Sequence, residues 1–151
     1  MFKSDLVSEF GIDERRRQHL EDDLQEAVCT LLKWALPADA AFWAVPNGGL
    51  RHTREAARLT RTGVRAGCPD LHIVYRGRLY CLELKAPKGQ LSATQSQMIS
   101  KLEACGVPTA VVRSISEVER ALKGWGLPLS AISRSNRIVL AIRHALSSFA
   151  G

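Results

Sequence analysis

Two β-rich segments separated by three residues limit the folds open to this chain more than any other feature. Residues 70–75 and 79–85 are rich in aliphatic and aromatic side chains, and Arg76-Gly77-Arg78 connects them. A connection this short joins antiparallel neighbours, so we expect a β-hairpin. Helical and strand patterns on both sides of the hairpin predict an α/β domain.

The flanking elements follow from apolar spacing and turn residues. Before the hairpin we expect a helix over 13–36, a buried strand over 40–45 and a helix over 53–62. After it we expect a helix over 92–105, a strand over 107–113 and a helix from Ser116, with Glu119 completing a capping box, to about Gly124. The buried stripe of the first helix comprises Leu20, Leu24, Ala27, Val28, Leu31 and Ala35.

One linker-like stretch divides the chain, residues 126–130. We therefore expect a domain over 1–125 and a C-terminal extension over 126–151. Apolar residues recur at helical spacing in the extension, at Ile138, Val139, Ile142, Leu146 and Phe149. The extension closes the core of the same domain, contacts a second subunit or adds basic surface, and the pattern leaves these three open.

The charge is unevenly distributed along the 151 residues, whose net charge is +6. Residues 1–50 carry five basic against nine acidic side chains, and the remainder carries sixteen against six. An anion-binding site is therefore expected after residue 50. No leader pattern or membrane-length apolar run occurs, and the four cysteines lack metal or redox spacing, so we expect a cytoplasmic protein with reduced core thiols and no membrane contact.

Asp70 heads one strand of the expected hairpin, and Glu83-Leu84-Lys85 lies in the other. Glu83 and Lys85 are two apart on a strand, so they share a face, while Leu84 points the opposite way. If the register brings Asp70 beside Glu83, the two carboxylates and the Leu84 carbonyl provide hard oxygen ligands for Mg²⁺ or Mn²⁺. The alternative is a surface ion pair between Glu83 and Lys85 on an edge strand.

Several sequence blocks in order resemble the VRR-NUC domain, a branch of the PD-(D/E)XK nucleases. The blocks are Val45-Pro46-Asn47-Gly48-Gly49 with Arg51, Ala56-Ala57-Arg58-Leu59, Gly63 to Leu71 with Pro69-Asp70, Glu83-Leu84-Lys85, and Lys88-Gly89-Gln90-Leu91-Ser92 with Gln95. The similarity spans about residues 20 to 122. It implies a restriction-endonuclease-like α/β fold with a mixed central sheet flanked by helices, and phosphodiester hydrolysis that depends on a divalent metal.

Carried over to this chain, the resemblance implies that Asp70 and Glu83 bind metal and that Lys85 is the catalytic lysine. Gln95 matches a glutamine of the helix after the second catalytic strand, although it also fits a capping box with Ser92. The glutamate of the first helix, a further metal ligand, matches Glu21.

Glu21 competes with Glu26 for that position in the first helix. The family pattern Glu-x-x-aliphatic-Gln fits Glu21, and helical geometry places Glu21 at the margin of the apolar stripe, while Glu26 projects nearly opposite it. The alternative for Glu21 is a solvated acid beside Asp22 and Asp23.

A row of arginines is the candidate DNA contact. It comprises Arg51, Arg54, Arg58, Arg61 and Arg65, at spacings of three and four residues. Such a row suits successive phosphates, although solvation of a helix face is the alternative. Asn47 and Lys88 lie in loops where we expect further DNA contacts, whereas His72 is expected to be structural and Trp34 and Trp43 to be core residues.

The resemblance therefore implies a nuclease for branched DNA such as four-way junctions. In the family that the chain resembles, small stand-alone members are associated with homodimers from phages or bacteria. A two-fold dimer would present two sites to symmetry-related strands. The alternatives are a flap or duplex nuclease and a non-catalytic DNA-binding module with the same fold.

Overall fold

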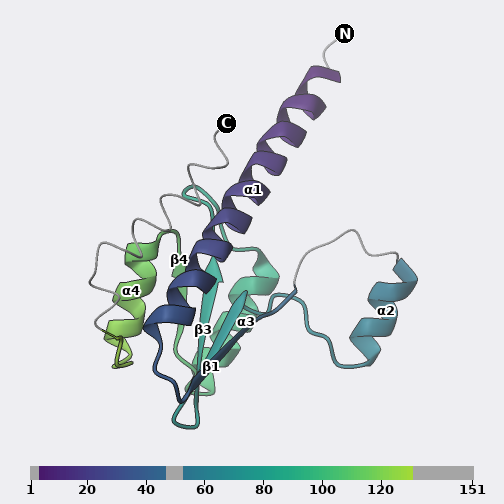
Figure 1. Ribbon diagram of the computed structural model, residues 1–151. Coiled ribbons are helices and arrows are strands. Elements are labelled where there is room, and N and C mark those ends of the chain that lie inside the picture. The colour runs from purple at the N-terminus through teal and green to yellow at the C-terminus, as the bar shows by residue number, and fades with distance from the viewer. Residues whose placement is uncertain (1–3, 47–52, 131–151) are drawn as a thin grey trace. The chain divides into compact units, whose positions relative to one another are not determined.

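The computed structural model describes residues 4–46 and 53–130, and places no side chains for residues 4–13 and 53–56. Its elements are α1 (Ser4–Ala35), β1 (Ala40–Ala44), α2 (Thr53–Arg61), β2 (Leu71–Tyr75), β3 (Arg78–Leu84), α3 (Ala93–Ala104), β4 (Thr109–Val112) and α4 (Ile115–Gly124), as Figure 1 shows. This order is the predicted one. No helix in the part of the chain described is both long and apolar enough to cross a membrane.

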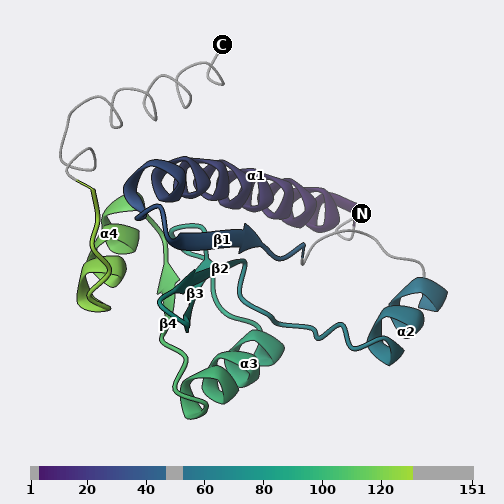
Figure 2. The same cartoon turned by 60° about the horizontal axis from the view of Figure 1, so that its bottom comes forward.

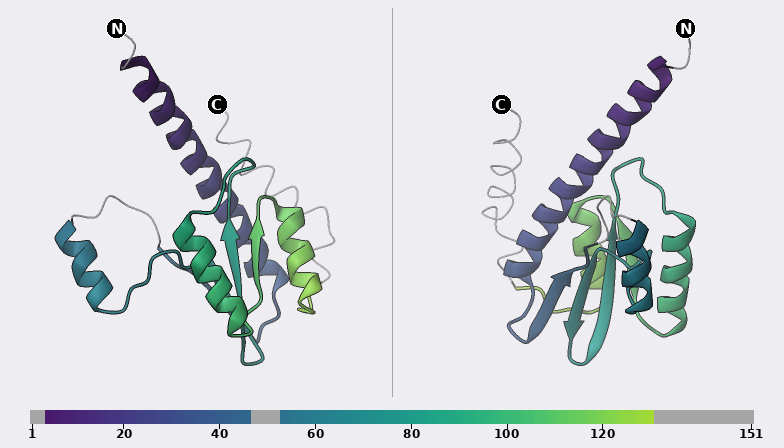
Figure 3. Two further views of the ribbon diagram at one scale, coloured as in Figure 1. Left: turned by 180° about the vertical axis from the view of Figure 1, so that it is seen from behind. Right: turned by 90° about the vertical axis from the view of Figure 1, so that its right-hand side faces the viewer.

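The four strands form one mixed sheet in the order β1-β2-β3-β4, with β3 and β4 adjacent in Figure 3. β1 pairs with β2, and β2 with β3, in antiparallel register. The Cys81 N–H donates to the Pro108 carbonyl and the Lys85 N–H to the Val112 carbonyl, so β4 runs parallel to β3. The α/β class with a mixed sheet between helices is therefore confirmed.

The hairpin turn is one residue shorter than predicted, because Tyr75 pairs with Arg78. Arg76 and Gly77 form the turn, with φ of 48° and 73°. Positive φ at both central residues is the geometry of a type I′ turn, which matches the twist of the two strands. This two-residue turn therefore fixes the register in which β2 and β3 pair at the candidate site.

β3 is buried on both faces. Leu82 is 0% exposed on one face, and Cys81 and Glu83 are 0% exposed on the other. α3 lies against the sheet, as Figure 2 shows, and Gln95 of α3 contacts Glu83. The prediction that β1 is buried is wrong, because β1 is an edge strand whose Trp43 is 45% exposed.

Contacts divide the chain into two compact units. The helical unit comprises Met1–Ala38, Leu84–Gly89 and Val112–Gly151, and the sheet unit comprises Asp39–Glu83 and Gln90–Val111. In the helical unit, α1 packs against α4. The buried residues of these two helices are Val28, Leu31, Leu32, Ala35, Val118 and Leu122.

The apolar stripe predicted for α1 is buried only from Val28 onward. Leu20 is 46% exposed, and Trp34, expected in the core, is 54% exposed. The linker-like stretch packs back onto the end of α1, since Leu127 is buried and the Ser130 N–H donates to the Ala35 carbonyl at 2.9 Å. Residues 131–151 of the predicted extension lie outside the described residues.

The N-terminus of α4 differs from the prediction. Ser114 is the N-cap and accepts a hydrogen bond from the Glu117 N–H, whereas Ser116 lies inside the helix. Both serines precede a glutamate by three residues, so the sequence fits a capping box at either position. The end of β4 at Val112 leaves room for the earlier cap, and the helix begins two residues sooner.

Candidate active site

Glu83 is the most deeply buried charged side chain among the described residues, with 0% exposure near the end of the central strand β3. Lys85, two residues later, is 7% exposed. A solvated ion pair on an edge strand is therefore wrong for these two residues. Burying a carboxylate is unfavourable unless other groups bind its charge, so Glu83 indicates a site built around it.

Asp70 directly precedes β2. Leu71 pairs with Leu82, and the same register continued by one residue would place Asp70 opposite Glu83. The Asp70 carbonyl accepts the Val45 N–H at 2.8 Å, which fixes this end of the strand. Opposite side chains of an antiparallel pair have Cβ atoms about 4.5–5.5 Å apart, so two carboxylates so placed are within reach of one cation.

Gln95 forms the capping box that the sequence allowed and also contacts Glu83. Its side-chain Oε1 accepts the Ser92 N–H at 2.8 Å, and its N–H donates to the Ser92 hydroxyl, which completes a capping box on α3. Its Nε2 donates to Oε1 of Glu83 at 2.5 Å. The cap fixes the amide group, so the Glu83 carboxylate meets a donor of fixed orientation.

Gly67 brings the loop before Asp70 close to the start of α3. A Cβ built at Gly67 would lie 2.5 Å from the Thr94 carbonyl oxygen, and the residue has φ of +77°. Both facts require glycine. The close approach places the loop that leads into Asp70 against the helix that carries Gln95, a contact that the sequence did not reveal.

Cys81 and His72 share this face of the sheet with Glu83, and burial favours the neutral form of both. Burial raises the pKa of the Cys81 thiol to about 11, with a smaller contribution from Cys68, while a hydrogen bond with Thr109 opposes the rise. Burial lowers the pKa of His72, whose ring meets Trp43 edge-on at 5.6 Å. The structural role of His72 stays a prediction, and Cys81 alone of the four free cysteines is fully buried.

In the helical unit, Glu21 contacts the segment that follows β3. Its Oε1 accepts the Ala86 N–H at 3.1 Å, one residue after Lys85. Glu21 is partly buried, whereas Glu26 is exposed, as helical geometry predicted. The interpretation of Glu21 as a solvated acid is therefore wrong.

The turn after Lys85 is held from two sides. The Gly89 N–H donates to the Ala86 carbonyl at 2.8 Å, and Arg113 donates from Nη2 to the Gly89 carbonyl at 3.0 Å. A Cβ at Gly89 would lie 3.1 Å from the Ala86 oxygen and 3.2 Å from Oε1 of Glu21. Nothing in the sequence analysis had identified Arg113, because a long-range contact to a backbone carbonyl leaves no local pattern.

The donor set suits a hard divalent cation. Asp70 and Glu83 supply carboxylate oxygens, and the Leu84 carbonyl follows directly in the chain, which is the oxygen chemistry of Mg²⁺ and Mn²⁺. Within residues 4–46 and 53–130, no three His, Cys, Asp or Glu side chains form a group that could hold a metal ion. Glu21 as a further ligand stays a prediction, since its observed contact is to the Ala86 amide.

The predicted DNA contacts are only partly within the described residues. Arg58, Arg61, Arg65 and Lys88 are exposed and available to a ligand. Asn47 and Arg51 lie outside the described residues, as does the side chain of Arg54.

Comparison with known families gives one match. A family model described as the VRR-NUC domain matches residues 12–115. No curated protein and no solved structure matches the chain significantly.

Proposed function

The chain belongs to the VRR-NUC family and is a nuclease domain, and on this premise we propose that it is a DNA endonuclease dependent on Mg²⁺ or Mn²⁺ that cuts branched DNA such as four-way junctions. The observation that carries the proposal is the fully buried carboxylate of Glu83, which accepts a hydrogen bond from Gln95 and follows Leu82, the strand partner of Leu71 next to Asp70. A domain that only binds DNA gains nothing from buried carboxylates, because they repel phosphate.

Asp70, Glu83 and the Leu84 carbonyl would hold the cation, with Glu21 as the further candidate ligand. When bound, such a cation lowers the pKa of a coordinated water and offsets negative charge on the phosphodiester. Gln95 keeps the Glu83 carboxylate in one orientation through the contact at Oε1. This fixed orientation lowers the reorganisation required during the reaction.

Lys85 is the proposed catalytic lysine. Its ammonium group orients the attacking water and offsets the charge that develops on the scissile phosphate. Burial of Lys85 supports this role, since a weakly hydrated ammonium interacts more strongly with phosphate oxygens than one in open water.

The DNA backbone is proposed to lie along Arg51, Arg54, Arg58, Arg61 and Arg65, with Asn47 and Lys88 as further contacts. The spacing of the arginines suits successive phosphates, and the exposure of Arg58, Arg61 and Arg65 supports their availability. These contacts provide affinity without reading bases.

We further propose that residues 1–125 form the nuclease domain and that residues 126–151 contribute to a homodimer contact or to the same core. Two sites related by two-fold symmetry suit the paired strands of a junction. A phage or bacterial cytoplasm fits the four free thiols.

The test compares wild type with Asp70→Asn, Glu83→Gln and the control Glu103→Gln, whose exposed glutamate lies on α3. Cleavage of four-way junctions, flaps, single strands and duplexes is measured with Mg²⁺ and with Mn²⁺, and Mn²⁺ binding by calorimetry. We expect the two site variants to lose about 10³-fold or more in cleavage rate, because metal charge stabilisation amounts to several kcal/mol. Glu103→Gln should match wild type.

Binding of junction DNA without any cleavage in either metal would instead support the non-catalytic module. Preferred cleavage of flaps or linear duplexes would support the other nuclease alternatives.

A further inference from the structure

A basic groove lies in the helical unit beside the turn that follows Lys85. Its volume is about 380 Å³, and its lining residues are Arg16, Arg17, Leu20, Ala86, Pro87 and Lys88. Arg16 and Arg17 come from α1, and Lys88 comes from the turn. Among the residues whose side chains the structure describes, every charged one that lines the groove is a cation.

The groove is held in place by the contacts described above. Glu21, one residue after Leu20, accepts the Ala86 N–H, and Arg113 donates to the Gly89 carbonyl. The carboxylate of Glu21 thus engages the turn backbone and is not among the lining groups. The groove is therefore a built feature of the unit, with fixed positions for its backbone.

The chemistry of the groove fits a sugar-phosphate backbone. Two guanidinium groups and one ammonium group match phosphate oxygens, with guanidinium able to donate two parallel hydrogen bonds. Leu20, Ala86 and Pro87 provide an apolar surface suited to deoxyribose. Leu20 is 46% exposed although it belongs to the predicted core stripe, which is explained if this side chain serves a ligand rather than the core.

We propose that this groove binds the phosphate backbone of a nucleic-acid strand next to the turn that follows Lys85. The inference rests on the proposed function, since that function brings a phosphodiester to Lys85. It adds Arg16 and Arg17 to the DNA contacts and gives Lys88 a defined place among them. These two arginines lie within residues 1–50, whose net charge is negative, so the charge of that segment as a whole directs attention away from them.

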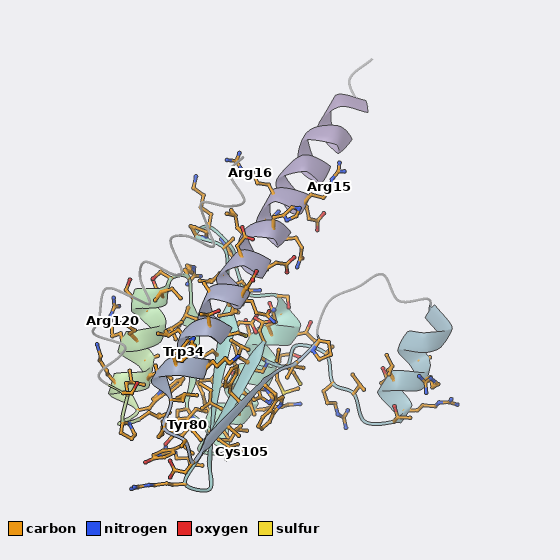
Figure 4. The ribbon with its side chains drawn as sticks, in the orientation of Figure 1. Arg15, Arg16, Trp34, Tyr80, Cys105 and Arg120 are labelled. Atoms are coloured by element: carbon orange, nitrogen blue, oxygen red, sulfur yellow. The ribbon has the colours of Figure 1, made fainter. Side chains whose placement is uncertain are left out.

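The test uses the full chain with the additional change Glu83→Gln, so that DNA is bound without being cut. The double variant Arg16→Gln/Arg17→Gln removes two charges from the groove, and glutamine keeps a helix propensity close to that of arginine. The matched control is Arg15→Gln/Lys33→Gln, which removes two charges from exposed positions of the same helix outside the groove. Figure 4 shows Arg15 and Arg16 leaving α1 in different directions.

Affinity for a fluorescent duplex and a four-way junction is measured by anisotropy in Mg²⁺ at several salt concentrations. We expect the groove variant to bind DNA about tenfold more weakly. The plot of log Kobs against log salt should become shallower, its slope losing about 2 in magnitude, about one for each phosphate contact removed. Adding Lys88→Gln should lower the slope by about 1 more. The control should keep the slope of its parent, and circular dichroism should show all variants folded.

Equal losses of DNA affinity in the groove variant and the control would overturn the inference, because they would show that DNA responds to the overall charge of the protein and not to the groove. Unchanged DNA binding with loss of salt-sensitive self-association in the groove variant would also overturn it, in favour of an acidic segment from a second copy. Failure of the parent to bind any DNA would instead refute the proposed function, and this inference with it.

Discussion

Two glutamates of this nuclease domain accept hydrogen bonds from amide groups. They lie in different units, and the two contacts have different effects. Glu83, in the sheet unit, is fully buried and meets a side-chain amide that a helix cap orients. Glu21, in the helical unit, is partly buried and meets the backbone N–H of Ala86. The first arrangement orients a carboxylate, whereas in the second the carboxylate orients a turn.

The difference shows how one residue type serves two tasks. A buried carboxylate with a movable partner would sample several orientations, so a fixed amide is useful where the carboxylate itself acts. A backbone N–H is immobile already, so the Glu21 contact stabilises the position of the turn and of Lys88 with it. The contrast between the two glutamates fails if Glu21 also binds the metal ion.

The largest expected effect comes from Glu21→Gln. The amide oxygen still accepts the Ala86 N–H, so the turn is kept and only the charge is lost. If Glu21 is a ligand, cleavage should fall by about 10²-fold or more, while Glu26→Gln, at an exposed position of the same helix, should leave it unchanged.

Single-turnover cleavage and thermal melting of both variants check this prediction. If Glu21→Gln cleaves DNA at the wild-type rate while Glu21→Ala cleaves it more slowly, the role of Glu21 is limited to holding the turn. A greater loss in Glu26→Gln would show that the family glutamate had been placed on the wrong residue.

The second prediction separates the two functions of Gln95. Gln95→Ala removes the acceptor of the Ser92 N–H, which is half of the capping box, together with the donor to Glu83. Ser92→Ala removes the other half, the cap hydroxyl, and leaves Gln95 in place. Loss of either half should lower stability by about 1 kcal/mol. Only Gln95→Ala should lower cleavage or Mn²⁺ affinity by about 10–100-fold, as expected for a residue that orients a ligand.

Denaturant unfolding, calorimetry with Mn²⁺ and cleavage rates measure the two variants. Equal losses of activity would mean that Gln95 acts through the helix start alone. Rescue by Gln95→Asn would not be expected, because the shorter amide cannot reach both partners.

The third prediction concerns the approach of the Asp70 loop to α3. Gly67→Ala and Gly63→Ala both place a side chain at positive φ, which destabilises each by about 1–2 kcal/mol. Only the Cβ at position 67 would meet backbone, at 2.5 Å from the Thr94 oxygen, while nothing lies within 4 Å at position 63. Gly67→Ala should therefore destabilise by about 2 kcal/mol more.

Urea unfolding monitored by tryptophan fluorescence compares the two alanine variants. Equal destabilisation would show that the loop and α3 do not approach closely in solution.

The sequence by itself determined the order of the elements and the hairpin, which follow from apolar periodicity and a short connection rich in turn residues. It left the register open, because the two-residue turn at Arg76 and Gly77 replaces the expected three-residue connection and shifts the pairing of the two strands by one residue. The sequence also ranked Glu21 above Glu26, since helical geometry alone separates their faces. The sequence did not distinguish Ser114 from Ser116 as the N-cap of α4, because each precedes a glutamate by three residues.

Only the tertiary structure decided which polar groups are buried and what they contact. Burial depends on strand order, which made β3 central and β1 an edge strand and so buried Glu83 while exposing Trp43. The contacts of Gln95 with Glu83, of Glu21 with Ala86 and of Arg113 with Gly89 join residues at least twelve positions apart. Such contacts arise when elements pack, and no spacing within a single segment encodes them.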